Sequence, residues 1–323
     1  MIHYAPLISA LVSILLISFL LSSKAGKSIQ DIPNERSLHS APIPRIGGVG
    51  LMAGTLSGWI FVPGVWVWWA VLPMLILCGV SLHDDMRGLP VRQRLMAHFV
   101  AAVLWIAGSG LLTQYGIWVG VVALLFVVWM TNLYNFMDGS DGLAGGMALF
   151  GFACYGVAAL IAHDDTLAMQ NFCIAAAALG FLYHNFPPAK VFMGDAGSIP
   201  LGFLASAMGL WGWQQGHWAA WFPLLVFSPF IVDASATLVK RSLRGAKVTE
   251  AHREHYYQRA IQLGWGHRKV ALAEYVLMAS AGVSALWALR RDDMVLVIAP
   301  LWLAIYIILM RWLDARWLTR AGG

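Results

Sequence analysis

The chain has 323 residues, of which 59% are hydrophobic and only 11% are Asp, Glu, Lys or Arg. Because a soluble domain usually carries about 25% charged residues, this composition excludes an ordinary soluble fold. The net charge of +5 is the one feature that favours a nucleic-acid partner, and we expect no such partner.

Long apolar runs follow one another along the chain, and a run of about 18 or more apolar residues predicts a helix that crosses the bilayer. We therefore expect an all-α polytopic membrane protein with about 11 transmembrane helices in a single domain, residues 1–323. We expect the first run to be a retained helix, since no Lys or Arg precedes it. The expected spans are residues 5–22, 46–61, 65–82, 92–112, 116–134, 143–162, 168–185, 198–212, 218–240, 269–289 and 293–312.

Charge predicts the orientation of these helices. If the N-terminus lies outside, the cytoplasmic segments are residues 23–45, 83–91, 135–142, 186–197, 241–268 and 313–323. With the flanking helix ends they hold 19 of the 21 Lys and Arg residues, and only Arg290 and Arg291 fall on the other side. Since positive residues stay in the cytoplasm, we expect a multi-pass protein of the cell inner (cytoplasmic) membrane, with its C-terminus in the cytoplasm.

Unusual polar residues gather on the same side. The outside connections are short and plain, whereas the cytoplasmic segments hold nearly every cluster of acids, amides and histidines. These clusters are Asp31 to Gly48, His83 to Asp85, Asn132 to Gly146, His184 to Ser198 and Glu250 to His267. Chance would scatter them over both faces, so their distribution predicts an active site at the cytoplasmic membrane surface.

Asp84 and Asp85 close the third expected span. An acidic pair at a helix end can serve simply for solvation at the interface. Two adjacent carboxylates repel each other, however, and a divalent cation or a cationic side chain would relieve that repulsion. Arg87, Arg92 and Arg94 follow within ten residues, and this mixture suits a site that handles both a metal and phosphates.

Two amides and two acids at intervals of three residues end the fifth span: Asn132, Asn135, Asp138 and Asp141. That spacing places neighbours on one helix face. Ionisable groups cost about 2.5–3.5 kcal/mol each near the membrane centre, so their density indicates function. A polar helix end with turns at its glycines is the structural alternative, but it does not explain the repeated Asn and Asp. Oxygen ligands of this kind suit Mg²⁺ or Mn²⁺.

Two later loops add candidates. In the first, glycines flank Asp195, which allows close approach of the backbone to a ligand and makes Asp195 a candidate metal ligand. Phe192 is a candidate for stacking on a base, or equally an interfacial anchor. The second, residues 241–268, carries His252, Arg253 and His255, with no Cys or third ligand that would indicate zinc. It is either a solvated basic loop or an anion-binding loop over a phosphate site.

Taken in order, these motifs resemble the polyprenyl-phosphate N-acetylhexosamine-1-phosphate transferases, also called glycosyltransferase family 4. The resemblance runs from residue 30 to residue 268 and is closest to the bacterial enzymes that initiate O antigen. It rests on Pro44-Arg-Ile-Gly-Gly48, Asp84-Asp85, Asn132 to Leu143 and Phe192-Met-Gly-Asp-Ala-Gly-Ser198.

The resemblance implies that undecaprenyl phosphate attacks a UDP-N-acetylhexosamine to give undecaprenyl-diphosphate-sugar and UMP, which initiates O-antigen, lipopolysaccharide or related envelope polysaccharide synthesis. It implies a phosphotransferase that uses Mg²⁺ or Mn²⁺, surrounded by membrane lipids, with a homodimer as the candidate assembly. The implied residues are catalytic Asp84, Asp85 and Asp138; substrate-binding Arg94, Asp141, Asn185, Phe192, His252, Arg253 and His255; and metal-binding Asn135 and Asp195.

Elementary chemistry agrees with these roles. Phosphoryl transfer needs positioning and charge neutralisation more than covalent chemistry. A phosphomonoester is already largely dianionic at neutral pH, so this nucleophile needs little help from a base. Asp84 or Asp85 would orient or deprotonate it, and a covalent aspartyl intermediate stays open.

Other functions stay open as well. Gly88 stands where many family members carry a third acid, and Tyr256-Tyr257-Gln258 where many carry clustered histidines. The missing histidines argue against the second enzyme candidate, a phospho-N-acetylmuramoyl-pentapeptide transferase.

A secondary transporter would favour mid-span ionisable residues in repeated halves, and a membrane scaffold would not need Asn and Asp clusters. The sequence does not identify the sugar, and it leaves N-acetylglucosamine, N-acetylfucosamine and N-acetylquinovosamine open.

Overall fold

The structure is a computed structural model that describes residues 2–24, 26, 29–33, 41–247, 250 and 252–321. Part of the predicted Asp31 to Gly48 cluster, residues 34–40, lies outside the described residues. The elements are η1 (Ile2–Tyr4), α1 (Ala5–Ser22), β1 (Gln30–Asp31), β2 (Ile43–Pro44), α2 (Gly47–Trp59), α3 (Trp68–Arg87), α4 (Val91–Gly108), α5 (Leu111–Phe136), α6 (Leu143–Ile161), α7 (Asp165–Asn185), α8 (Asp195–Gln214), α9 (Trp221–Val226), α10 (Ser228–Leu243), α11 (Tyr256–Ala260), η2 (Ile261–Trp265), α12 (Gly266–Ala288), η3 (Asp292–Met294) and α13 (Val295–Ala321).

These helices confirm an all-α, multi-pass membrane architecture. Within the described residues, seven segments are long and apolar enough to cross a membrane: Ile2–Ser22, Trp68–Arg87, Leu111–Phe136, Leu143–Ile161, Asp165–Asn185, Tyr256–Ala288 and Val295–Thr319. The other expected spans coincide with α2, α4, α8 and the pair α9 and α10, which do not meet that criterion. The count of about 11 spans therefore stays a prediction.

Helix ends differ from the expected ones in ways that matter for the site. α3 continues to Arg87, so Asp84 and Asp85 lie within its last turns. α5 ends at Phe136, and only the first two of the four residues spaced by three are helical. The expectation that all four share one helix face is therefore wrong. The ninth expected span is interrupted between α9 and α10.

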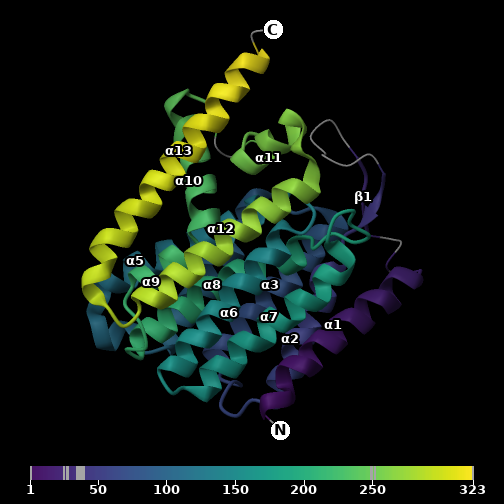
Figure 1. Ribbon diagram of the computed structural model, residues 1–323. Helices are drawn as coiled ribbons and strands as arrows, with labels where there is room; N and C mark the ends of the chain where they lie inside the picture. The colour runs from purple at the N-terminus through teal and green to yellow at the C-terminus, as the bar shows by residue number, and fades with distance from the viewer. Residues whose placement is uncertain are drawn as a thin grey trace.

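The connections meet at two opposite ends of the bundle, as alternating spans require. Figure 1 shows the N-terminus at one end and β1, α11 and the C-terminus at the other. The connections expected outside meet one another: His217 Nε2 lies 2.9 Å from Asp164 Oδ2, and Gln114 Nε2 donates to the Gln214 carbonyl at 3.2 Å.

Close backbone packing brings the beginnings of α2 and α8 together. A Cβ added at Gly48 would lie 2.3 Å from the Gly197 nitrogen and 2.7 Å from the Met193 carbonyl oxygen. Gly47 and Gly48 donate backbone hydrogen bonds to the carbonyls of Phe192 at 2.9 Å and Met193 at 2.8 Å. Small residues allow membrane helices to approach this closely.

The small sheet extends this junction. β1 and β2 are antiparallel, with Gln30 opposite Pro44 and Asp31 opposite Ile43. The Phe192 N–H donates to the Pro44 carbonyl at 2.8 Å, so the segment before α2 is joined to the segment before α8. Two motifs that lie far apart in the sequence are therefore neighbours at the same end of the bundle.

Gly48→Ala is expected to destabilise the protein by about 1–3 kcal/mol, because the new methyl group would meet backbone that cannot rotate away. Gly79→Ala in α3 is the matched control, since nothing lies within 4 Å of a Cβ added there. Thermal unfolding of both variants in detergent checks the expectation. Equal unfolding midpoints for the two variants would contradict the close packing.

Candidate active site

The guanidinium group of Arg94 bridges two carboxylates where α3, α4 and α8 meet. Arg94 Nη1 lies 3.1 Å from Asp84 Oδ2 and 3.3 Å from Asp195 Oδ2. The other oxygen of Asp84 accepts a hydrogen bond from Leu89 N at 2.5 Å, so the loop after α3 also holds this carboxylate. Three residues predicted from the sequence thus come together, and Arg94 is bound to protein carboxylates.

Asp85 binds the beginning of α8. Its two oxygens accept hydrogen bonds from Asp195 N at 3.1 Å and Ala196 N at 2.9 Å. The first amides of a helix lack partners within the helix, and the helix dipole favours a negative charge there. Gly194 precedes them with a φ of 71°, in the left-handed region that favours glycine. Asp85 therefore positions Asp195 through the backbone.

Asn135 and Asp138 complete the cluster from the end of α5. Burial and the Asp84 carboxylate raise the pKa of Asp195, and the Asn135 side chain acts in the opposite direction, so the two predicted metal ligands lie near each other. Burial and the negative charges of Asp195 and Asp85 raise the pKa of Asp138 well above its usual range, although Arg45 acts in the opposite direction. The cluster thus carries more negative charge than its nearby cations offset.

This donor set fits a hard divalent cation. Mg²⁺ is usually held by one or two carboxylates, and water and substrate phosphates supply the remaining ligands. In the part of the chain that the structure describes, no group of three or more His, Cys, Asp and Glu side chains could hold a metal by itself. Asn135 and Asp195 would therefore share a cation with water or a bound diphosphate.

Two predicted substrate-binding residues join the loop after α5 to the loop after α7. Asn185 Oδ1 accepts from Gly142 N at 2.8 Å, and Asn185 Nδ2 donates to the Val191 carbonyl at 2.8 Å. Asp141 Oδ2 accepts from Ala189 N at 3.0 Å. Both side chains are buried, and both shape the backbone of the two loops.

The second oxygen of Asp141 faces a histidine from another helix. His267, at the beginning of α12, places Nδ1 3.7 Å from Asp141 Oδ1 and 3.0 Å from Ser140 Oγ. Phe192 is half-buried at the end of the loop after α7, beside β2. The contacts of His267 bring the beginning of α12 to the loop after α5, beside the loop after α7.

The loop that follows α10 reaches the cluster through the short helix α11. Asp233 of α10 accepts hydrogen bonds from Tyr256 N at 2.9 Å and Tyr257 N at 3.0 Å. The Tyr257 hydroxyl donates to the Phe136 carbonyl at 3.1 Å, and the ring centroids of His255 and Phe136 lie 6.3 Å apart. α11 is thus held against the end of α5, next to the carboxylate cluster.

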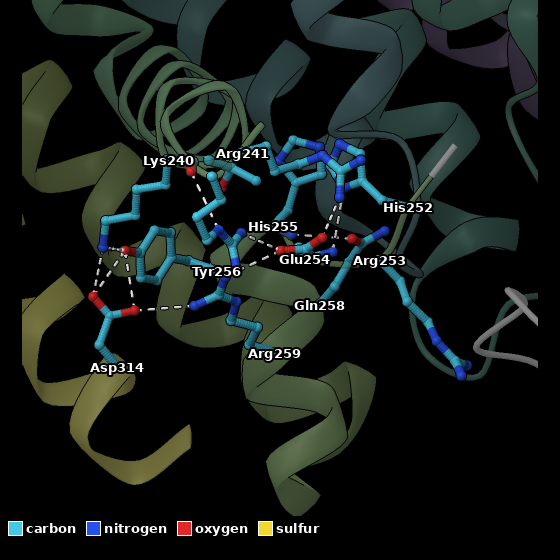
Figure 2. A network of polar contacts seen from close by, with 12 residues as sticks. Lys240, Arg241, His252, Arg253, Glu254, His255, Tyr256, Gln258, Arg259 and Asp314 are labelled. Atoms are coloured by element: carbon cyan, nitrogen blue, oxygen red, sulfur yellow. Dashed lines mark hydrogen bonds and ion pairs between the residues drawn. The ribbon is translucent and has the colours of Figure 1, made fainter. Parts of the chain in front are cut away.

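The arginines of this loop differ in whether they form ion pairs with carboxylates. Glu254 binds both Arg241 and Arg244, the latter at 2.5 Å. Arg253 is exposed, and its guanidinium forms no ion pair with the described residues. Figure 2 shows its side chain extending away from the network of its neighbours. Of these arginines, Arg253 is the one available to a ligand.

The two histidines lie together on the inner side of the loop. The ring centroids of His252 and His255 are 4.9 Å apart, and His255 Nδ1 lies 3.4 Å from Asp233 Oδ1. Burial and the positive charges of His255 and Arg241 lower the pKa of His252 to about 4. His252 is therefore a neutral hydrogen-bonding group at neutral pH.

Two larger cavities lie elsewhere. One of about 370 Å³ is lined by Trp59, Trp105 and Trp211 near the end that carries the N-terminus. The other, about 380 Å³, lies between α10, α11, α12 and α13 and is mostly apolar, with Asp233 and Glu274 in its wall. Neither cavity is lined by Asp84 or Asp195. The candidate site is therefore identified by its acidic, amide and basic side chains and not by the size of a cavity.

Sequence reasoning missed Arg45, Asp233, Glu254 and Asp314. Asp233 carried a signal, because an acid inside an expected span is costly and indicates a specific use. Asp314 of α13 binds residues 74 and 55 positions earlier in the chain, Lys240 at 2.5 Å and Arg259 at 3.0 Å. No local pattern predicts pairs at such separations.

Comparisons with known proteins find related transferases with two kinds of named activity. The profile described as Glycosyl transferase family 4 matches residues 67–212. The chain is 26% identical over 296 residues to a probable undecaprenyl-phosphate N-acetylglucosaminyl 1-phosphate transferase of Bacillus subtilis, with 86% of this chain and 80% of the relative covered. It is 28% identical over 310 residues to a decaprenyl-phosphate N-acetylglucosaminephosphotransferase of Mycobacterium tuberculosis, with 80% and 76% covered. It is 34% identical over 229 residues to a phospho-N-acetylmuramoyl-pentapeptide-transferase of Moorella thermoacetica, with 61% and 71% covered.

Asp85→Asn is expected to lower stability by about 0.5–2 kcal/mol, the usual effect of losing a helix cap. The amide can accept from only one of the two N–H groups of α8, and it carries no negative charge. Asp84→Asn leaves the Arg94–Asp195 pair in place and should lower stability less. Thermal unfolding in detergent compares the variants, and a wild-type midpoint for Asp85→Asn would rule out this capping role.

Proposed function

We propose that this chain, which belongs to glycosyl transferase family 4, transfers an N-acetylhexosamine-1-phosphate from a UDP-sugar to undecaprenyl phosphate and releases UMP. Two of the relatives are named for transfers to undecaprenyl and decaprenyl phosphate. The observation that carries the proposal is the Arg94 bridge between Asp84 and Asp195, with Asn135 beside it. Acids and amides around a cationic side chain, together with the exposed Arg253, whose guanidinium forms no ion pair with the described residues, suit the positioning of a diphosphate.

Asp84 and Asp138 are the acids that we assign to the lipid phosphate. Both oxygens of Asp85 accept backbone hydrogen bonds that hold α8, whereas one oxygen of Asp84 is held by the Arg94 side chain, which can turn to a bound phosphate. The lipid phosphate is largely dianionic at neutral pH, so orientation and removal of a residual proton are sufficient help. This assignment favours direct attack over a covalent intermediate on Asp85.

Asn135 and Asp195 are the proposed ligands of Mg²⁺ or Mn²⁺, which when bound neutralises charge on the diphosphate. We assign Asp141 and Phe192 to the uracil, because they lie on the two joined loops beside the cluster. Asn185 supports that site by holding the loops together.

We assign the diphosphate and the sugar to the last loop. Arg253 offers a planar fork of donors that matches phosphate oxygens, and it is not occupied by a described carboxylate. His252 and His255 lie beside it at the end of α5, where a sugar attached to the diphosphate would reach. This arrangement supports the loop as the part that distinguishes one UDP-sugar from another.

The biological setting forms the finer part of the proposal. We propose a multi-pass protein of the cell inner membrane that works at the cytoplasmic surface and initiates O-antigen, lipopolysaccharide or related envelope polysaccharide synthesis. A muramoyl-pentapeptide transfer is the second candidate, and the 34% identity to the Moorella thermoacetica protein favours it. The absence of clustered histidines after His255 favours the first.

Purified protein with undecaprenyl phosphate and Mg²⁺ is expected to release UMP from a UDP-N-acetylhexosamine and not from UDP-N-acetylmuramoyl-pentapeptide. Separate reactions with UDP-N-acetylglucosamine, UDP-N-acetylfucosamine and UDP-N-acetylquinovosamine identify the sugar. Removal of metal with EDTA should abolish turnover, and added Mg²⁺ or Mn²⁺ should restore it, because the cluster needs a cation to accept a diphosphate. Release from the pentapeptide substrate alone would establish the second candidate, and full turnover in EDTA would contradict the metal assignment.

Arg253→Lys is expected to impair turnover although it keeps the charge, because it loses the planar fork. Arg253→Ala should lose more, roughly 10²–10³ in rate, the usual effect of removing a contact to transition-state charge. His255→Ala should change the ratio of rates with two UDP-sugars. Arg316→Gln on α13 is the control for loss of an exposed positive charge. Rates for the Arg253 variants equal to that of the control would show that the loop serves orientation alone.

A further inference from the structure

The charged residues beneath the last loop form one connected chain that ends on α13. Asp314 binds Lys240 Nζ at 2.5 Å and Arg259 Nη1 at 3.0 Å. Arg259 Nη2 in turn lies 3.7 Å from Glu254 Oε2, and Glu254 also binds Arg241. Figure 2 shows this continuous network between the C-terminal helix and the loop.

The cations of this network depend on two carboxylates. The side chains of Arg241 and Arg259 are only 7% and 8% exposed. Their Nε atoms have no hydrogen-bond partner within the described residues. A buried guanidinium that loses its carboxylate keeps an uncompensated charge and must move or recruit another anion. Glu254 is the remaining carboxylate near Arg259, and it also balances Arg241 and Arg244.

α11 transmits any such movement to the site. Arg259 and Tyr256 both lie on this five-residue helix, and the Tyr256 hydroxyl also donates to Asp314 at 3.2 Å. The neighbouring Tyr257 is bound to the end of α5, and the loop that carries Arg253 leads directly into the helix. A shift of α11 would therefore displace Arg253 relative to the carboxylate cluster.

We propose that Asp314 is a positioning residue for the transfer reaction: by holding Lys240, Tyr256 and Arg259 it leaves Glu254 to Arg241 and Arg244, and so keeps Arg253 unpaired and directed toward ligand. The inference rests on the proposed function for its kinetic consequence. The geometry that supports it, the network between α10, α11 and α13, is independent of the substrate.

Steady-state UMP release by the purified full-length protein tests the kinetic consequence. Asp314→Asn should raise KM for the UDP-sugar and lower kcat/KM roughly tenfold, the size of a coupling between contacting charges. Asp314→Glu should restore most of the loss, because it keeps the charge. Asp293→Asn, an exposed acid before the other end of α13, is the matched control and should behave as wild type. A merely structural role predicts fewer active molecules, with kcat lowered and KM unchanged, and that result would overturn the inference.

A double-mutant cycle tests whether Asp314 acts on the loop through Arg259. If Asp314 acts through Arg259, the double variant of Asp314→Asn and Arg259→Gln should be no worse than the more severe single variant. Strictly additive losses would show that the two residues act separately and would overturn the route.

Protease accessibility separates a failure of this inference from a failure of the proposed function. Lys247 is 78% exposed in the loop, so trypsin cleavage after it, mapped by mass spectrometry, reports loop position without turnover. Asp314→Asn should be cleaved several-fold faster than wild type and Asp293→Asn. Equal cleavage rates would overturn the inference even if the wild type is active. Faster cleavage in a protein that releases no UMP would support the network and contradict only the proposed function.

Discussion

Two hydrogen bonds, donated by backbone amides at the beginning of α8 to a side-chain carboxylate near the end of α3, join these helices, and the arrangement of the site depends on them. The Asp85 carboxylate accepts the amides of Asp195 and Ala196, so the side chain of Asp195 is presented beside Arg94 and Asp84. The contact satisfies donors that a helix cannot satisfy itself and places a negative charge at the positive end of its dipole. Both effects gain strength where water is scarce.

The same interaction recurs at the other side of the site. Asp233 accepts the first two amides of α11, which holds the last loop against α5 as Asp85 holds α8 against α3. Acids at membrane depth are expensive, and here two of them bind the amides at the beginnings of helices. Asp84 and Asp138, the acids that we propose to act on the lipid phosphate, lie near the ends of α3 and α5.

Much of this architecture could be predicted from apolar runs and charge, and its details could not. Hydrophobic length predicted where helices lie, and the one-sided distribution of polar clusters predicted that acids and amides of separate segments would gather at one end, as Asp84, Asp195 and Asn135 do. Asp85 and Asn185 bind backbone atoms of segments far away in the sequence, contacts that their predicted roles did not include. Such partners depend on how helices pack, which side-chain identity at one position does not encode. The Arg253 side chain, by contrast, stands out only because its neighbours are paired.

The separation along the chain between the partners in the network has a consequence for biogenesis. Lys240 and Arg259 are synthesised 74 and 55 residues before Asp314, the carboxylate that they bind. While the ribosome is still producing α12 and α13, those cations have no such partner, and the loop beside them cannot adopt its final arrangement. Completion of this network therefore waits for synthesis of the last helix.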